Sequence, residues 1–490
     1  MKLSKSKYCN AIQCKKMLWL LKNKPEEKGE ESNDLILDNG IEVHETAKNI
    51  FKNHINIEFN EDLNKMIEDT NKALENKNVV ITEASFIYDN NFCSVDILKK
   101  NNDEYEMYEV KGASKVNDIY IEDLSYQYYI LTNLGMNIKE CYVVYLNSNY
   151  LRKGELDLNK LFIKEKVTIR VKELQTKVKR NIKEINEYME NKKEPSDDIG
   201  NYCFKPYMCP YFKYCTRNLP TPNIFDIRIM YKTEKMKLYK KGVYTFEDAY
   251  KEDIDPLYKI QVNHEINDIK DEINKEELKK FIATLSYPMY FLDFETFKSP
   301  IPKYDNSSPN EQIPFQYSLH YIEKENGELK HKEFLAEADI DPRREVAESL
   351  VRDIPKDVCS LAYNMMFEKG IIKRLAEIFP DLSDHLMNIH DNMKDLMIPF
   401  KERHYYNKRM QGSYSIKYVL PALFPDDPSL DYHNLELIQN GMGAMSNYSD
   451  LGKHTKEEQE FIRERLLRYC ELDTYAMVKV FYKLLEVINE

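Results

Sequence analysis

The stretch YPMYFLDFETF, residues 287–297, is strongly apolar and yet carries two acids, Asp293 and Glu295. Because side chains two residues apart on a β-strand point to the same face, the two carboxylates should lie together on one face of a buried strand. Burying two unpaired carboxylates there would be prohibitive, so the pattern predicts bound cations. Strand-like stretches follow at residues 315–323 and 331–337, which makes this segment the start of an α/β domain.

Two later segments supply further acids to the same candidate site. AYNMMFEKG, residues 362–370, indicates the end of a strand that runs into a helix carrying Glu368. LLRYCELDTYAMVKV, residues 466–480, is a periodic helix that places Tyr469 and Asp473 one turn apart on one face. Four acids from three segments are typical of a two-metal phosphodiester site, in which Mg²⁺ or Mn²⁺ ions clamp the attacking and leaving oxygens.

The N-terminal half of the chain holds a second group of candidate residues. In EYEMYEVKG, residues 104–112, Glu109 and Lys111 share one face of a strand. In NNFCSVDILKK, Asp96 projects from another strand. Carboxylates beside apolar surface repel unless a divalent cation offsets their charge, so a magnesium site is predicted, with Lys111 polarising the attacking water and His44 completing the ligands. An ordinary surface salt bridge is the alternative for Glu109 and Lys111.

Clustered cysteines form a third group. The stretch CFKPYMCPYFKYC contains Cys203, Cys209 and Cys215, three of the nine cysteines in the chain. Cysteines grouped in this way indicate metal ligands. The Cys-x-x-Cys pairs of zinc fingers are missing, so a closed tetrahedral zinc site is not the first choice. A fourth ligand is needed, and the candidates are Cys9 and Cys14.

Length and composition limit the class of protein. A chain of 490 residues predicts two to four domains, and 42% hydrophobic with 31% charged residues excludes a disordered or fibrous protein. No apolar stretch is long enough to span a membrane and the N-terminal segment is too short for a signal peptide, so we expect no membrane partner and a cytoplasmic location. The net charge of −12 argues only against a general basic coat protein for nucleic acid.

The order of helical and strand-like patterns predicts an α/β (α+β) fold in two domains. Residues 1–217 are expected to form the first domain, with helices over 1–24 and 40–77 followed by an antiparallel meander, a helix and another strand. Residues 218–285 are charged and helical, which is typical of a connector. Residues 286–490 form the second domain.

The N-terminal motifs resemble, in type and order, the RecB-like branch of the PD-(D/E)XK nucleases. These motifs are Gly-x-x-x-His on a helix, Val-Asp, Glu-Val-Lys, and a glutamine on the next helix. The resemblance implies a set of metal ligands and catalytic residues: ligands His44, Asp96 and Glu109, and catalytic Lys111 and Gln127. Where the family has a tyrosine four residues after the glutamine, this chain has Leu131.

The C-terminal motifs resemble the DEDDy exonucleases of the ribonuclease H-like fold. Asp-x-Glu, Asn-x-x-Phe-acid and Tyr-x-x-x-Asp occur in the family's order, although Glu368 stands where the usual member has aspartate. The resemblance implies that four acids bind two metal ions and that a tyrosine positions the water: ligands Asp293, Glu295, Glu368 and Asp473, with catalytic Tyr469. The two resemblances together are similar to a bacterial family that fuses both nuclease types.

One cysteine before the first nuclease motifs and three after them resembles the iron–sulfur staple of RecB-like nucleases. The resemblance implies a [4Fe-4S] cluster held by Cys14, Cys203, Cys209 and Cys215, with zinc or an unmetallated core as alternatives.

The expected function is a metal-dependent nuclease that hydrolyses DNA at ends or in single strands, in repair, recombination or defence. RNA stays open as a substrate. Two other classes are consistent with the sequence. One is a nucleic-acid-binding protein with a degenerate site, and the other is a redox-sensing iron–sulfur protein that only binds DNA.

Overall fold

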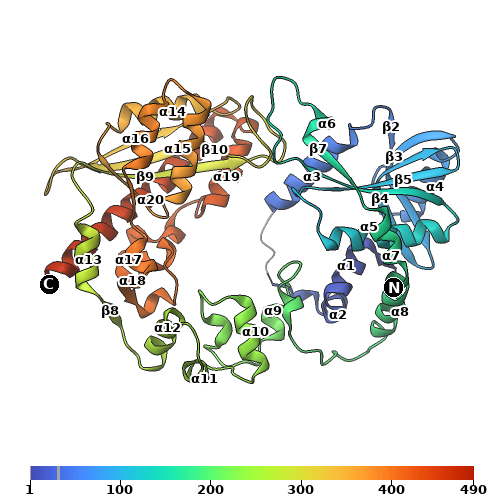
Figure 1. The fold of residues 1–490 in the computed structure, drawn as a ribbon, viewed down its shortest axis with the longest axis horizontal. Coiled ribbons are helices and arrows are strands. Elements are labelled where there is room, and N and C mark those ends of the chain that lie inside the picture. Colours follow the sequence, from blue (N-terminus) through green and yellow to red (C-terminus); the bar gives the residue numbers. More distant parts are fainter. Residues whose placement is uncertain (1, 30–33) are drawn as a thin grey trace. The chain divides into compact units, whose positions relative to one another are not determined.

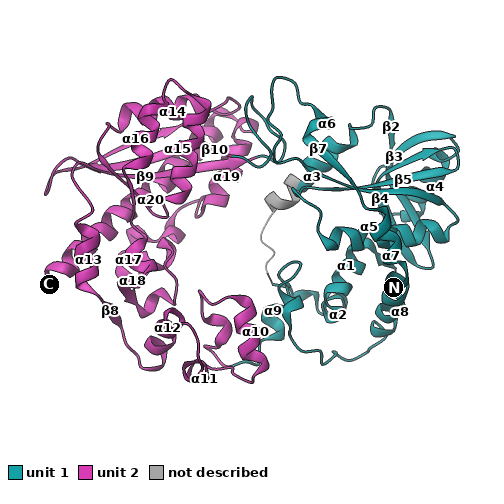
Figure 2. Cartoon of the chain, in the orientation of Figure 1, with its two compact units in different colours: residues 1–219, 299–311 teal, residues 220–298, 312–490 magenta. Residues whose placement is uncertain are grey.

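The computed structural model describes residues 2–29 and 34–490, and its contacts divide the chain into two compact units (Figure 2). Unit 1 comprises residues 1–219 and 299–311, and unit 2 comprises residues 220–298 and 312–490. The segment expected as a connector therefore belongs almost entirely to unit 2. In addition, the short segment 299–311, which lies within the expected second domain, belongs to unit 1.

A mixed sheet forms the centre of unit 1 (Figure 1). Its strand order in the described residues is β2-β3-β4-β5-β6-β7, with β1 paired to β4; β5 and β6 are parallel, whereas β3-β4-β5 is an antiparallel meander. The strands are β1 (Leu3–Ser4), β2 (His54–Asn56), β3 (Asn78–Tyr88), β4 (Asn91–Asn101), β5 (Glu104–Lys111), β6 (Asn137–Leu146) and β7 (Phe162–Lys166).

The meander is built as its sequence predicts. Asp89 and Asn90 both have positive φ, 47° and 60°, at the turn between β3 and β4, where short polar residues tolerate the left-handed conformation. Asn102 likewise has a positive φ, 52°, at the turn between β4 and β5. These tight turns fix the register that brings Asp96 on β4 near Glu109 on β5.

Helices cover both faces of this sheet. One core packs α1, α5 and α8 against it, and a second core packs α3 on the other face. The helices of unit 1 are α1 (Lys5–Gln13), α2 (Lys15–Asn23), α3 (Asp34–Lys48), α4 (Leu63–Ala73), α5 (Asp118–Asn133), α6 (Leu158–Leu161), α7 (Thr168–Glu173), α8 (Gln175–Tyr188) and α9 (Phe212–Cys215).

Two helix predictions were wrong in their extent. The helix expected over 1–24 is broken at Cys14, whose extended backbone (φ −157°, ψ 113°) ends α1 and begins α2. The helix expected over 40–77 is two helices separated by β2. Asn53 with φ 64° interrupts the chain there, and Asp62 caps α4 through its side chain.

The segment 299–311 completes the second core of unit 1. Ile301 is buried in that core with residues of α3 and β6. The guanidinium Nη1 of Arg152 donates to the carbonyls of Pro302 and Lys303 at 2.9 and 2.8 Å, and its backbone N–H donates to Ser307 at 3.0 Å. This segment is therefore a structural part of unit 1 and not a free loop.

Unit 2 is built on a five-stranded mixed sheet of order β11-β10-β9-β12-β13 in the described residues. Strands β9, β10 and β11 are antiparallel, and β12 and β13 run parallel to β9. The strands of unit 2 are β8 (Asp271–Ile273), β9 (Met289–Lys298), β10 (Gln312–Ile322), β11 (Leu329–Leu335), β12 (Cys359–Ala362), β13 (Met393–Asp395) and β14 (Tyr405–Asn407).

Alternation along β9 sorts its side chains between the two faces of this sheet. Tyr290, Leu292 and Phe294 pack in the core with α14 and α15. The intervening residues, including Asp293, face α20, where Phe291 contacts Phe481. The helices of unit 2 are α10 (Lys232–Lys240), α11 (Phe246–Lys251), α12 (Pro256–Ile266), α13 (Lys275–Ile282), α14 (Arg343–Asp353), α15 (Met366–Ile378), α16 (Ser383–Asp391), α17 (Ile398–Lys401), α18 (Ile416–Leu423), α19 (Gly441–Asp450) and α20 (Lys456–Asn489).

The fold is thus a mixture of helices and mixed sheets in both units, which confirms the α/β (α+β) class. No helix among residues 2–29 and 34–490 combines the length and the apolar character that crossing a lipid bilayer requires.

Candidate functional sites

The structure brings all five predicted residues of the N-terminal motifs together in unit 1. We call the group the Glu109 cluster; it consists of Lys5, His44, Asp96, Glu109, Lys111, Asp123 and Gln127. The Nε2 atom of His44 on α3 lies 3.1 Å from Oδ2 of Asp96. Lys111 donates to Oε1 of Glu109 at 2.5 Å, and the Gln127 amide donates to Oε2 of Glu109 at 2.6 Å.

Two members of this cluster were missed by sequence reasoning. Lys5, the first residue of α1, places its ammonium 3.2 Å from Asp96 and 3.0 Å from Glu109. Asp123 on α5 accepts a hydrogen bond from Lys111 at 2.9 Å and another from Gln127 at 3.2 Å. Asp123 could have been found, since it precedes Gln127 by one helical turn, whereas no local signal identifies Lys5.

The charges in the Glu109 cluster largely compensate one another. Burial raises the pKa of Asp96, but the charges of His44 and Lys5 outweigh it and hold the pKa well below its usual range. The charge of Asp96 in turn raises the pKa of His44 to about 10, so the imidazole is protonated at neutral pH. Burial, with the charges of Asp123 and Asp96, raises the pKa of Glu109 to about 7.

A cavity of about 650 Å³ opens beside the cluster within unit 1. Lys5, Lys111 and Asp123 line it, together with the rings of Tyr120 and Tyr207. The lining of the cavity thus combines ammonium groups with aromatic rings. Leu131, which replaces the tyrosine of the RecB-like pattern, is fully buried in the core of unit 1 and does not take part in the site.

The second set of predicted acids converges in unit 2. We call it the Asp293 cluster; it consists of Asp293, Glu295, Glu368 and Asp473. One carboxylate oxygen from each of Asp293, Glu295 and Asp473 lies within 4.8 Å of the others. Glu368, at the start of α15, is close enough for its charge to act on Asp293 and Glu295. Its Oε2 atom is buried without a hydrogen-bond partner in the described residues.

Two tyrosines complete this site. Tyr469 on α20 is 4% exposed and lies one helical turn before Asp473, whose charge acts on it. Tyr432, in the short helical turn Tyr432–Asn434, donates to Oδ1 of Asp473 at 2.6 Å and was missed by sequence reasoning. Lys417 on α18 is the cation whose charge acts on Glu295 and Asp473.

The Asp293 cluster carries more negative charge than its surroundings neutralise. Burial, together with the charges of Asp473 and Glu295, holds the pKa of Asp293 well above its usual range, and Glu295 is raised in the same way. Burial raises the pKa of Glu368 to about 8 and that of Asp473 to about 6. Without a metal ion, Glu368 therefore holds a proton at pH 7, whereas Asp473 gives up most of its proton by that pH.

Hard oxygen donors with unpaired charge suit Mg²⁺ or Mn²⁺, and the donor set of the Asp293 cluster fits such ions. The orphaned oxygen of Glu368 and the raised pKa values have a common explanation if divalent cations replace the protons. The Glu109 cluster also offers a ligand set for one cation. The ammonium of Lys5 lies against Asp96 and Glu109 and would have to withdraw, and His44 would have to release its proton before it could bind the ion.

The four predicted cysteines lie near one another in unit 1. The pKa of the Cys209 thiol is raised by burial to about 12, and the charges of Cys14, Cys203 and Cys215 all act on it. The backbone N–H of Cys209 donates to the carbonyl of Cys203 at 2.8 Å. Cys9 lines the cavity beside the Glu109 cluster instead, so the arrangement favours Cys14 as the fourth member.

Comparison with known proteins gives a match to part of the chain. Residues 290–415 match a family described as a domain of unknown function, DUF2779. This segment contains Asp293, Glu295 and Glu368 and ends before Asp473. Nothing in that description mentions a nuclease or an iron–sulfur protein.

The chain is also similar to two distant relatives, both uncharacterized. An uncharacterized protein of Ureaplasma parvum is 25% identical over 229 residues, which cover 42% of this chain and 33% of the relative. An uncharacterized protein of Mycoplasma genitalium is 27% identical over 242 residues, which cover 46% of this chain and 34% of the relative. The chain thus spans about a third of the length of the relatives that it matches.

Proposed function

We propose that this chain is a metal-dependent nuclease that hydrolyses phosphodiester bonds of DNA at ends or in single strands. The observation that carries the proposal is the convergence of three carboxylates from β9 and α20 within 4.8 Å, beside Tyr469. The order of motifs favours a ribonuclease H-like exonuclease fold for unit 2 and a RecB-like PD-(D/E)XK fold for unit 1.

In the Asp293 cluster, the four carboxylates would hold two divalent cations. When bound, these ions supply Lewis-acid stabilisation of the attacking and leaving oxygens of a phosphodiester. Tyr469 orients the attacking water through its hydroxyl, which also contacts Asp473. Tyr432 fixes the carboxylate of Asp473 by donating to Oδ1.

In the Glu109 cluster, His44, Asp96 and Glu109 would hold one cation. Lys111 polarises the water, and Asp123 keeps its ammonium in position at 2.9 Å. Gln127 holds Oε2 of Glu109 at 2.6 Å and so orients that carboxylate. The tyrosines of the adjoining cavity provide stacking surfaces for bases.

For the cysteines we propose a [4Fe-4S] cluster held by Cys14, Cys203, Cys209 and Cys215, with zinc as the alternative. Thiolates around one tetrahedral zinc would lie about 3.8 Å apart, since each Zn–S bond is about 2.3 Å. The charges of Cys14, Cys203 and Cys215 act on the Cys209 thiol, so the four sulfur atoms are near one another. Among the described residues, however, they do not form a group as compact as a zinc site requires. A centre with several irons holds its ligands further apart. All nine cysteines are free, which suits the reducing cytoplasm.

The test is degradation of an end-labelled oligonucleotide with Mg²⁺ or Mn²⁺, comparing Asp293→Ala with Lys111→Ala. Single-stranded DNA, duplex DNA and RNA of the same sequence separate the substrate classes. Asp384→Ala and Lys139→Ala are matched controls, because both side chains are exposed and lie outside the clusters. We expect Asp293→Ala to lose removal of nucleotides from a 3′ end by roughly a hundredfold or more.

Lys111→Ala should remove a second, separable activity. Product ladders that stay unchanged in both variants would show that neither cluster cleaves. Loss of cleavage in Asp293→Ala alone would favour a protein in which the Glu109 cluster only binds nucleic acid, as its compensated charge suggests. Cleavage or binding that changes between oxidised and reduced protein would favour the redox-sensing class.

A further inference from the structure

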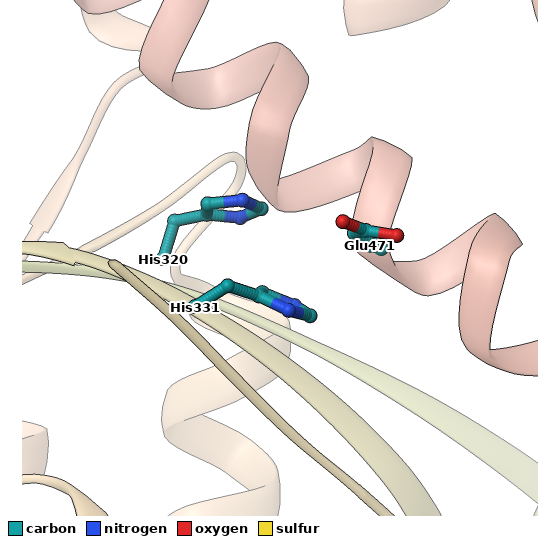
Figure 3. Close-up of side chains that lie close together, drawn as sticks. All are labelled: His320, His331 and Glu471. Carbon is teal, nitrogen blue, oxygen red and sulfur yellow. The ribbon is translucent and has the colours of Figure 1, made fainter. Parts of the chain in front are cut away.

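A group of metal-binding side chains outside both clusters lies on the α20 face of the sheet of unit 2. His320 is on β10, His331 is on β11 and Glu471 is on α20. One donor atom from each lies within 4.8 Å of the others. In Figure 3 both imidazoles extend from the sheet toward the carboxylate of Glu471, which projects from the helix.

The sheet register places the two histidines together. His320 and His331 are direct partners in the antiparallel pairing of β10 with β11. Their ring centroids are 4.4 Å apart with an interplanar angle of 34°. His320 is 4% exposed, so its imidazole is held within the packing between the sheet and α20.

Hydrogen bonds to two hydroxyls engage one nitrogen of each ring. The hydroxyl of Thr474 lies 3.1 Å from the carbonyl of Glu471, 2.6 Å from the hydroxyl of Ser318 and 2.8 Å from Nδ1 of His320. The hydroxyl of Ser318 also hydrogen-bonds Nε2 of His331 at 2.9 Å. A hydroxyl can donate or accept, so these bonds hold the two rings in place in either tautomer.

The nitrogens that these hydroxyls leave available to an ion are Nε2 of His320 and Nδ1 of His331. Hydroxyls behind the imidazoles take the role that outer hydrogen-bond partners play for metal-ligating histidines, which is to fix the ring orientation. Glu471 is exposed, so its carboxylate can rotate to close on an ion.

We propose that His320, His331 and Glu471 bind a transition-metal ion, Zn²⁺ in the first place, at a site separate from the Asp293 cluster. Two imidazoles and one carboxylate suit zinc, whereas Mg²⁺ prefers oxygen ligands throughout. The ion would join β10 and β11 to α20, the helix that carries Tyr469 and Asp473. It therefore has a positioning role, and the proposal stands whether or not the chain cleaves nucleic acid.

The experiment counts zinc ions bound per chain in excess Mg²⁺, which keeps the oxygen-rich clusters from competing for zinc. The variants are His331→Phe, which keeps a ring in the pair, and Glu471→Gln, which changes an exposed side chain. Glu460→Gln is the matched control, since Glu460 is also exposed on α20. Cys209→Ser separates this site from any zinc held by the cysteines.

We expect the wild type, Glu460→Gln and Cys209→Ser to bind zinc at this site, and His331→Phe and Glu471→Gln to lose one equivalent each. Substituted Co²⁺ should give visible bands without thiolate charge transfer, and these bands should vanish in the same two variants. Zinc should raise the melting temperature of unit 2 in the wild type, Glu460→Gln and Cys209→Ser, but not in His331→Phe or Glu471→Gln. Equal zinc content in wild type and His331→Phe, or loss only in Cys209→Ser, would overturn the proposal and leave a stacked histidine pair.

Discussion

The Glu109 and Asp293 clusters contain similar numbers of buried acids but differ in how their charge is balanced. In the Glu109 cluster, the carboxylates of Asp96, Glu109 and Asp123 lie among three cationic groups, the side chains of Lys5, His44 and Lys111. In the Asp293 cluster, the charge of Lys417 acts on Glu295 and Asp473, and the pKa values of all four carboxyls are raised.

The difference shows what each cluster requires from solution. In the Glu109 cluster, the charges of His44 and Lys5 hold the pKa of Asp96 low, although burial and the neighbouring acids raise the pKa of Glu109 to about 7. A buried carboxylate without a cationic partner takes up a proton, as Glu368 does with a pKa of about 8. The Asp293 cluster therefore has the stronger need for external cations, and the Glu109 cluster must exchange a cation of its own for a metal ion.

The largest expected effect comes from removing one of the four cysteines of unit 1. The loss of stability should be confined to that unit. Cys209→Ser should bleach an absorbance at about 400 nm and destabilise unit 1, since a centre shared by Cys14 and Cys203 closes a long loop. Fluorescence of Trp19 reports on unit 1 alone, because it is the only tryptophan. The sheet of unit 2 should melt as in the wild type.

A colourless protein with stoichiometric zinc, prepared without oxygen, would replace the iron–sulfur assignment by a zinc staple. Colour that persists in Cys14→Ser but disappears in Cys9→Ser would move the fourth ligand. Equal loss of stability in both units would contradict the independence of the two clusters.

Neutralising one acid in each cluster tests the comparison directly. Asp123→Asn removes one of the two carboxylates that pair with the buried ammonium of Lys111 and should cost about 3 kcal/mol of unfolding free energy in unit 1. Glu368→Gln should cost far less at pH 7, since Glu368 already holds a proton there. Denaturant unfolding measures both, and Asp118→Asn, 99% exposed on the same helix as Asp123, is the control. Equal costs would contradict the assigned charge states.

The third prediction concerns pH. The folded pKa of Glu368 is about 8 and that of Asp473 about 6, against ordinary values of 4.5 and 3.8. Between these limits the folded state holds protons that the unfolded state has lost, so metal-free unit 2 should become less stable as the pH rises from about 4 to 8. Mn²⁺ needs the deprotonated carboxylates and should therefore stabilise more at pH 8 than at pH 5.

Thermal melting followed by near-ultraviolet circular dichroism would measure this dependence with and without Mn²⁺. Glu368→Gln should flatten the slope above pH 6. A stability of unit 2 that rises with pH in the absence of metal would show that these carboxyls are ionised in the folded state.

The smallest expected effect is a change in metal affinity at the Glu109 cluster. Lys5→Met removes the ammonium that lies against Asp96 and Glu109, so Mn²⁺ no longer competes with it and should bind several-fold more tightly. Lys7→Met, exposed on the same helix, should leave the affinity unchanged. Weaker Mn²⁺ binding in Lys5→Met would mean that Lys5 supports the ligands instead of competing with the ion.

The sequence predicted the part of the Glu109 cluster that local patterns encode. Strand alternation placed Glu109 and Lys111 on one face, and the turns that set the register of β4 and β5 are visible as Asn and Asp residues. Lys5 could not be predicted, because it lies 91 positions before Asp96 and reaches it only through the packing of α1. Such a contact depends on tertiary structure and leaves no periodic signal.

The same limit applies in unit 2. The acids on β9 and α20 follow from periods of two and of about four residues, but Tyr432 is 41 positions before Asp473 and sits in a short turn. The break at Cys14 was also missed, because the apolar pattern of residues 1–24 continues through it. There the backbone of one cysteine overrides helix propensity.

The segment 299–311 has a consequence for the order in which the chain folds during synthesis. A ribosome makes residues 1–219 first, but Ile301 and the partners of Arg152 emerge only after 79 residues of unit 2, 220–298, have been added. N-terminal domains usually fold first as they leave the ribosome. Here unit 1 can close its second core only once residue 311 is outside the exit tunnel, and a fragment cut at Leu219 would never close it.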